Sequence, residues 1–521
     1  GSNILLSAAA GSGKTSVLTQ RVIQLMEDDQ KDIDKFLIFT FTRAAAANMK
    51  EKIMEKIVKG LDDPERAEFY REQLTKINQA SIMTIHSFCN SVIRENFYFL
   101  GIDPNFSIYE ETQSETVKID ILDRLFEERY HQKDEKFLNL VEIYSDNRDD
   151  RKLAQLVLEL YNHSVNHVEF NQWKQEMIDR FKDKDLWLDL LKKHVDEYFD
   201  DAIDARESIL DMISSGDAGD KVVKILMDEK ESLIKGKILL NQDVRNFNVT
   251  FKTLSLPKEV DPELKSRVNA IRKTYKDMIN GLKKKYYGEV AIDEHLEMFA
   301  MQLPALSDLL DLLSEFAETF LEYKKNHNVL EYSDLEHFTL EILEEEEVAK
   351  RYQELYDYVF VDEYQDSSYI QEAIIQKIIR KGNLFMVGDL KQSIYKFRSA
   401  VPEIFADKYR TFSRDESAID FKLDLNKNFR SRKVILDFIN YVFTDLMTDS
   451  FGGMEYDDTT RLYHVNHSFN GSDVPDEVHL VKTGHQTLSK VDLEVQEIAE
   501  RIQKLNVEEG VRLKDIVIIM R

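Results

Sequence analysis

The chain begins with Gly1-Ser2 and then reads Asn3-Ile4-Leu5-Leu6-Ser7-Ala8-Ala9-Ala10-Gly11-Ser12-Gly13-Lys14-Thr15-Ser16-Val17-Leu18-Thr19-Gln20-Arg21-Val22. A short apolar run, a glycine-rich turn ending in Gly-Lys-Thr, and a segment with helical spacing follow in that order. This order is that of the phosphate-binding loop between a strand and a helix. The strict pattern has glycine where this chain has Ala8, and an ordinary glycine-rich turn is the alternative interpretation. The stretch favours an α/β fold that binds nucleoside phosphates.

Each residue type in this loop has a physical role in binding phosphate. Gly11 and Gly13 can adopt backbone angles that are closed to other residues. The N–H groups of the loop then point inward at a helix N-terminus and surround phosphate oxygens. Lys14 reaches the β- and γ-phosphates, and the Thr15 hydroxyl is a ligand for Mg²⁺. We therefore predict that the nucleotide is bound by Ala8, Ala9, Ala10, Gly11, Ser12, Gly13, Lys14 and Thr15.

The composition is that of a globular protein: 43% of the 521 residues are hydrophobic and 32% are charged. No apolar run approaches the roughly 20 residues of a membrane span, and no signal peptide opens the chain, so we expect a cytoplasmic protein without membrane contact. The single cysteine, Cys89, excludes a disulfide framework and a cysteine-based metal site. The net charge of −27 argues against a nonspecific nucleic-acid binder, although a local groove can be positive on an acidic protein.

Strands and helices alternate in the first hundred residues and again from residue 356 onward. The predicted strands are residues 36–42, 81–84, 356–361, 384–387, 421–425, 478–481 and 515–520. The predicted helices are residues 43–60, 87–99, 432–446 and 491–505, with a polar connection at residues 448–470. This alternation is typical of a parallel sheet covered by helices. Because the chain stops directly after a strand, we expect it to be a fragment of a longer protein.

Between these parts lies a long stretch, from about residue 104 to about residue 327, in which almost every window is helical. The clearest helices are residues 116–129, 152–162, 188–214 and 306–326. We predict a helical insertion domain whose many charges form solvated faces. A basic run, Lys283-Lys284-Lys285, followed by Tyr286-Tyr287, is an alternative contact for a phosphate backbone.

A second predicted strand, far from the loop in the sequence, ends in acidic residues. The predicted strand Val359-Phe360-Val361 ends in Asp362-Glu363, and open α/β sheets bind ligands at the carboxyl ends of their strands. We predict that Asp362 holds Mg²⁺ through its water shell and that Glu363 is the general base for the water that attacks the γ-phosphate.

Two later strand ends add a neutral amide, aromatic rings and cations. Gln392 can hydrogen-bond a γ-phosphate or the attacking water. Tyr395, Phe397 and Arg398 are residue types that stack on unpaired bases and bind phosphates, with burial of Phe397 in the core as the alternative. Arg430 can stabilise charge on the transferring phosphoryl group, with an ordinary surface position as the alternative.

These blocks, in this order, resemble a superfamily 1 DNA helicase of the UvrD/Rep/PcrA type. The closest resemblance within it is to the AddA/RexA component of a helicase–nuclease, with RecB as another relative. The matching stretches are residues 8–15, 39–52, 84–89, 332–335, 359–366, 384–398 and 425–432. Phe397 stands where some relatives carry tryptophan.

The resemblance implies a RecA-like motor domain 1A, a helical domain 1B and the start of a second RecA-like domain 2A. The expected boundaries are 1–104 and 328–446 for 1A, 105–327 for 1B, and 447–521 for the connection and truncated 2A. It also implies ATP and Mg²⁺ as cofactors, Lys14, Glu363, Gln392 and Arg430 as catalytic residues, and Thr15 and Asp362 at the metal. Candidates for single-stranded DNA contact are Thr40, Phe41, Thr42, Arg43, His86, Tyr395, Phe397 and Arg398.

The function that the resemblance implies is ATP-driven translocation on DNA. The expected substrates are single-stranded and double-stranded DNA ends, processed for recombinational repair of double-strand breaks with the help of a nuclease domain and an AddB/RexB-like partner subunit. The family's adenine-contacting glutamine motif, later helicase motifs and nuclease domain have no counterpart in these 521 residues, so we expect no unwinding by this chain alone. A stand-alone UvrD/PcrA-like repair helicase and a nucleotide-switched scaffold without translocation are the alternatives.

Overall fold

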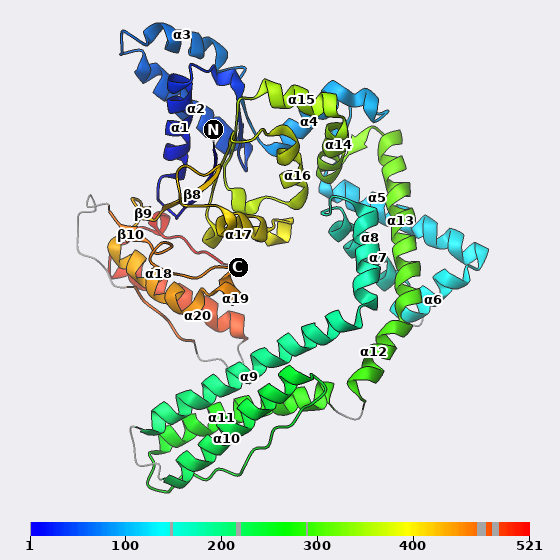
Figure 1. The fold of residues 1–521 in the computed structure, drawn as a ribbon, viewed down its shortest axis with the longest axis vertical. Coiled ribbons are helices and arrows are strands. Elements are labelled where there is room, and N and C mark those ends of the chain that lie inside the picture. The colour runs from blue at the N-terminus through cyan, green and yellow to red at the C-terminus, as the bar shows by residue number, and fades with distance from the viewer. Residues whose placement is uncertain are drawn as a thin grey trace. The chain divides into compact units, whose positions relative to one another are not determined.

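The computed structural model describes residues 2–145, 149–214, 220–287, 290–465, 476–481 and 489–520. The chain divides into two compact units (Figure 1). The first comprises residues 1–83, 356–367 and 380–521, and the second comprises residues 84–355 and 368–379. The chain therefore leaves the first unit for the second and returns to complete the sheet in which it began.

The first unit is built on a six-stranded sheet in which all neighbouring strands are parallel. In spatial order the strands are β3 (Ser81–Met83), β2 (Phe36–Phe39), β6 (Tyr358–Val361), β7 (Leu384–Gly388), β1 (Asn3–Ala8) and β8 (Asp420–Leu425). The register places Val361 beside both Phe39 and Met386. Strands from distant parts of the sequence thus end along one edge, as the α/β prediction requires.

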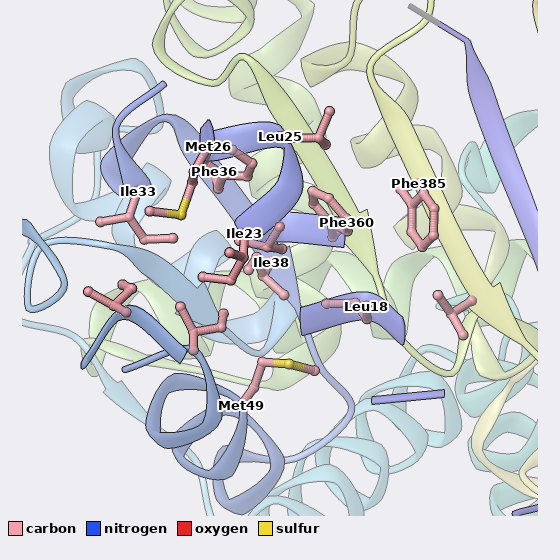
Figure 2. Close-up of a cluster of buried hydrophobic side chains, with 14 of the residues drawn as sticks. Leu18, Ile23, Leu25, Met26, Ile33, Phe36, Ile38, Met49, Phe360 and Phe385 are labelled. Atoms are coloured by element: carbon pink, nitrogen blue, oxygen red, sulfur yellow. The ribbon is translucent and has the colours of Figure 1, made fainter. Parts of the chain in front are cut away.

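Helices on this sheet are held by their apolar sides. Helix α1 (Lys14–Asp28) and helix α2 (Arg43–Gly60) contribute Leu18, Met26 and Met49 to one buried cluster with the strands. Figure 2 shows these side chains around Ile38 of β2 and Phe360 of β6. Each fully buried Leu, Ile or Phe contributes about 1.5–3 kcal/mol relative to exposure, so the cluster fixes the positions of the strand ends.

The first unit has further elements besides the six-stranded sheet and helices α1 and α2. They are η1 (Ile33–Lys35), α3 (Ala67–Lys76), η3 (Tyr364–Asp366), η4 (Leu390–Gln392), η5 (Lys396–Arg398), α17 (Pro402–Thr411), β9 (Lys427–Asn428), α18 (Lys433–Leu446), α19 (Asp449–Gly452), β10 (Tyr463–His464), α20 (Lys490–Val507) and η6 (Leu513–Asp515). Strands β9 and β10 form a separate parallel pair.

The second unit is almost entirely helical. Its elements are α4 (Ile85–Asn96), η2 (Phe97–Phe99), β4 (Ser107–Ile108), α5 (Glu111–Gln132), α6 (Glu135–Tyr144), α7 (Arg151–Ser164), α8 (Phe170–Lys182), α9 (Lys184–Ser214), α10 (Asp220–Gln242), α11 (Pro262–Tyr286), α12 (Ile292–Met301), α13 (Leu303–Asn326), β5 (Val329–Leu330), α14 (Tyr332–Glu344), α15 (Glu346–Leu355) and α16 (Tyr369–Ile378). One core lies among α5, α6, α7 and α13, and another lies among α9, α10 and α11, which run side by side in Figure 1. No helix among the described residues is long and apolar enough to cross a membrane.

A buried ionic network joins helices of the second unit. The Nζ of Lys324 lies 2.6 Å from Asp334 Oδ1 and 3.4 Å from Glu331 Oε2, and the Nζ of Lys118 lies 2.9 Å from Glu331 Oε1. Burial pushes the pKa of Glu331 upward, but the charges of Lys324 and Lys118 outweigh burial and hold that pKa below its usual value. Each buried charge therefore has a partner, which is the condition under which burial is tolerated.

Most predicted elements are confirmed, with shifts at their ends. The strand predicted at residues 36–42 ends at Phe39, because Thr42 caps α2 by accepting a hydrogen bond from Ala45 N–H. In the same way Thr84 caps α4, so that helix begins at Ile85 instead of residue 87.

Two strand predictions are wrong. Residues 478–481 and 515–520 form no strand, and Leu480 and Ile519 are 93% and 91% exposed. A strand requires a hydrogen-bonded neighbour, and among the described residues no strand pairs with either segment. The helix predicted between them is confirmed as α20.

Candidate nucleotide and DNA site

The loop after β1 has the backbone of a phosphate cradle. Gly11 and Gly13 have φ values of +69° and +88°, in the left-handed region that favours glycine. A Cβ on Gly11 would lie 2.7 Å from Asn428 Nδ2 and 2.8 Å from Arg430 Cβ, so no other residue fits there. The Ser12 Oγ is buried without a hydrogen-bond partner among the described residues, and a phosphate oxygen is a group that would satisfy it.

Three of the predicted catalytic residues meet beside this loop. The Nζ of Lys14, at the start of α1, lies 2.9 Å from Glu363 Oε2 and 3.4 Å from Gln392 Oε1. Glu363 follows β6 and Gln392 follows β7. The parallel sheet thus brings a cation, a carboxylate and an amide from three distant segments to one point.

The two carboxylates after β6 differ in environment. Burial, followed by the charge of Glu363, raises the pKa of Asp362 to about 6. The Glu363 side chain is 34% exposed, and its φ of +52° is rare for a residue with a side chain. Strained backbone of this kind is concentrated at functional sites.

The donor set at this point fits Mg²⁺. The Asp362 carboxylate and the Thr15 hydroxyl are oxygen ligands of the type that Mg²⁺ takes. The described residues contain no group of three or more His, Cys, Asp or Glu side chains arranged for a metal. A Mg²⁺ ion that keeps several waters and contacts substrate phosphates is consistent with so few protein ligands.

Arg430 lies close to Gly11 of the loop, and its side chain is exposed. The segment that carries it is fixed by Asn428, whose Nδ2 donates to Ala10 O at 2.7 Å. The Oδ1 of Asn428 accepts from the N–H groups of Arg430 and Ser431, both at 2.8 Å.

Four of the DNA candidates form an exposed aromatic and cationic group. The rings of Phe41 and Tyr395 are 4.6 Å apart, and those of Tyr395 and Phe397 are 5.9 Å apart. The Arg398 guanidinium lies 5.7 Å from the centres of both the Tyr395 and Phe397 rings. Phe397 is 77% exposed, so the alternative that placed it in the core is wrong.

The remaining DNA candidates have local partners. Thr40 is buried and its hydroxyl donates to Thr42 O, while Thr42 caps α2. Arg43 is exposed at the first position of α2. His86 belongs to the second unit, where its Nε2 lies 3.2 Å from Glu336 Oε1 and its ring contacts Tyr332. Their roles in DNA binding stay predictions.

The basic run at residues 283–285 forms the last turn of α11. Cations are favourable at that end of a helix, and the Tyr287 ring packs on Phe247 with 4.7 Å between centres. The three lysines therefore belong to a helix of the α9, α10 and α11 bundle.

Sequence reasoning missed residues that hold the site together. Gln365 and Asp389 link the segments after β6 and β7, and Asn428 links the loop to Arg430. Phe429, next to Asn428, donates its backbone N–H to Gly11 O and exposes half of its side chain. All four stand inside the motif stretches. For Gln365, Asp389 and Asn428 a polar side chain near a strand end was the available signal, and Phe429 carried none.

Comparison with known proteins agrees with this geometry. The UvrD/REP helicase N-terminal domain matches residues 1–413. The chain belongs to the UvrD/REP helicase family. The match includes the loop, the Asp362-Glu363 pair and the Tyr395–Arg398 group, and it stops before Arg430.

Curated relatives carry names that describe one subunit of an ATP-dependent helicase/nuclease. One from Alkaliphilus oremlandii is 34% identical over 100% of this chain and 46% of its own length. One from Clostridium novyi is 36% identical over 97% of this chain and 44% of its own length. One from Staphylococcus haemolyticus is 33% identical over 96% of this chain and 43% of its own length. The resemblance to a helicase–nuclease is thus confirmed, and the chain spans about half the length of these relatives.

Proposed function

We propose that this chain supplies the ATP-hydrolysing motor of an ATP-dependent DNA helicase. The observation that carries the proposal is the meeting of Lys14, Glu363 and Gln392 at one point of the sheet edge. The same segment that ends in Gln392 continues directly into the exposed group of Tyr395, Phe397 and Arg398. A nucleotide site and a surface suited to unpaired bases therefore share one short piece of chain.

The reaction follows from these side chains. The loop N–H groups and Lys14 bind the phosphates of ATP, and Gln392 orients the attacking water or a γ-phosphate oxygen. Glu363 accepts the proton as the water oxygen bonds to the γ-phosphorus and the bond to the bridging oxygen breaks, giving ADP and phosphate. Arg430 stabilises the charge that develops on the transferring group. Bound Mg²⁺, held by Thr15 and through water by Asp362, would neutralise phosphate charge.

The type of enzyme to which the motor belongs is inferred from the relatives' names and from the sequence. We propose a cytoplasmic helicase–nuclease of the AddA/RexA type, acting with an AddB/RexB-like subunit on single-stranded and double-stranded DNA ends during repair of double-strand breaks. The relatives are named as one subunit of their enzymes, which supports a partner, and the DNA candidates support the substrate. The domain limits predicted from sequence remain part of this proposal.

The test is ATP hydrolysis by the full-length protein with and without oligo-dT. We expect stimulation by DNA, and we expect Glu363→Gln to lower turnover about 10²- to 10⁴-fold, the usual contribution of a general base. Glu55→Gln on the exposed face of α2 is the matched control and should be unchanged.

Binding of oligo-dT supplies the second readout. Log affinity should fall with log salt because cationic side chains release counterions from the DNA backbone. Absence of oligo-dT binding, with or without nucleotide, would rule out the helicase and favour a nucleotide-switched scaffold.

A further inference from the structure

Gln365 is a buried amide at the centre of the site. It lies on η3 and is 1% exposed. Its Nε2 donates to Glu363 Oε2 at 2.8 Å and to Asp366 Oδ2 at 3.2 Å, and its Oε1 accepts from the Asp389 N–H at 2.9 Å. Both ends of the amide are therefore used, each toward a different strand end.

These bonds continue into a closed ring. Asp389, also 1% exposed, accepts from Gln392 Nε2 at 2.7 Å. Gln392 Oε1 lies 3.4 Å from Lys14 Nζ, and Lys14 returns to Glu363 at 2.9 Å. Within this ring, Gln365 is the residue that joins the segment after β6 to the backbone after β7.

The position of Gln365 is fixed by the strand beside it. A Cβ on Gly388, the last residue of β7, would lie 2.5 Å from Gln365 Oε1 and 2.8 Å from Phe405 Cε2. Only glycine lets the amide approach the strand this closely. The residue before Gln365, Tyr364, is itself buried, so the backbone that carries the amide has little freedom.

The arrangement distinguishes the two oxygens of Glu363. Lys14 and Gln365 both donate to Oε2, and within the described part of the chain no hydrogen bond reaches Oε1. A carboxylate held in this way keeps one oxygen with its lone pairs available. Because Glu363 sits on left-handed backbone, side-chain bonds are also needed to stabilise its conformation.

We propose that Gln365 is a positioning residue that holds Glu363 for proton abstraction by tying its carboxylate to the Asp389 backbone. This inference rests on the proposed function, since it assumes that Glu363 is the general base. The amide donor fixes Oε2 and leaves Oε1 to accept the proton. The amide acceptor fixes the distance between the base and the segment that carries Gln392.

Two substitutions test the donor and acceptor groups of the Gln365 amide in different ways. Gln365→Glu keeps the shape and the oxygen that accepts from Asp389 N–H, but it replaces the donor with a carboxylate oxygen facing Glu363. Gln365→Met removes both ends at similar length. Gln376→Glu is the control, because the Gln376 amide, exposed on α16, bonds to Glu372 of its own helix.

The measurement is steady-state ATP hydrolysis by the full-length protein with saturating oligo-dT, together with nucleotide binding. We expect both Gln365 variants to lower kcat about 10- to 100-fold, as displacement of a catalytic group by about 1 Å does. The KM for ATP should stay within about twofold of wild type, because the loop and Lys14 are unchanged. The Gln376 variant should match wild type.

The outcomes decide between the possibilities. Wild-type kcat in Gln365→Glu would overturn the positioning role while leaving the proposed function intact. A fall in kcat accompanied by an equal loss of ATP binding would overturn it as well, since that pattern indicates general damage to the pocket. A wild-type protein that hydrolyses no ATP would overturn the proposed function and this inference together.

Discussion

Replacing Asn428 with alanine is expected to damage both stability and the phosphate-binding loop. Asn428 is 1% exposed and its side chain makes three hydrogen bonds to backbone, at 2.7, 2.8 and 2.8 Å. Alanine would leave the Ala10 carbonyl and the N–H groups of Arg430 and Ser431 without these partners. At about 1 kcal/mol for each net hydrogen bond, the free energy of unfolding should fall by about 3 kcal/mol.

The assay is urea unfolding, followed by titration of a fluorescent ATP analogue into the folded protein. ATP affinity should fall as well, because the Ala10 carbonyl orients the loop. Asn428→Asp keeps both acceptor bonds and loses the donor, so its loss of stability should be intermediate.

Asn426→Ala is the matched control. The Asn426 amide lies 3.5 Å from two carbonyl oxygens, at the limit of a hydrogen bond, and its removal should cost less than about 1 kcal/mol. Equal losses for the Asn426 and Asn428 variants, or unchanged ATP affinity in Asn428→Ala, would refute the role of Asn428 in holding the loop.

Three further outcomes are expected. Glu331→Gln should lower the free energy of unfolding by about 1.5–3 kcal/mol at pH 7, the value of hydrogen bonds to charged groups, because Lys324 keeps Asp334 and Lys118 keeps Glu115 as partners. Because the pKa of Glu331 is lowered in the fold, the wild-type advantage exists above its usual 4.5 and should shrink as urea unfolding is repeated at lower pH. Ser399→Gly should raise the free energy of unfolding in urea by up to about 1 kcal/mol, since Ser399 has a φ of +64°; a decrease would show that this backbone is not strained. Phe397→Ala should weaken oligo-dT binding by about 1–3 kcal/mol in an anisotropy titration, and unchanged affinity would remove Phe397 from the DNA site.

The parts of the site that sequence predicts are those with a local signature. A glycine-rich turn before a helix and an acidic pair after an apolar strand identify Lys14 and Glu363. The rule that parallel strands end at one edge then predicts that they approach each other. The structure adds the distance, 2.9 Å.

The parts that sequence does not predict depend on contacts between distant segments. Nothing local to Gln365 indicates that its amide spans two strand ends, and nothing local to Asn428 indicates a bond to Ala10. The strand prediction for residues 515–520 is wrong because it rests on composition alone. Their composition is that of a strand, but a strand forms only beside a neighbouring strand, which local composition does not reveal. Phe397 is apolar yet exposed, because the short helix η5 that carries it places the ring at the surface.

The parallel pairing of β1 with β7 has a consequence for biosynthesis. Asn3 accepts a hydrogen bond from the Leu384 N–H, and the two residues are 381 positions apart. At about 5–20 residues per second, the ribosome needs roughly 20–75 s to supply that partner. The helical unit is contiguous apart from residues 368–379, so nearly all of it is synthesised during this interval. Over the same time the apolar strands β1 and β2 have edges whose partner strands have not yet been synthesised. The nascent chain is therefore expected to bind chaperones through residues 1–83, and the nucleotide site forms only after Gln392 has left the ribosome.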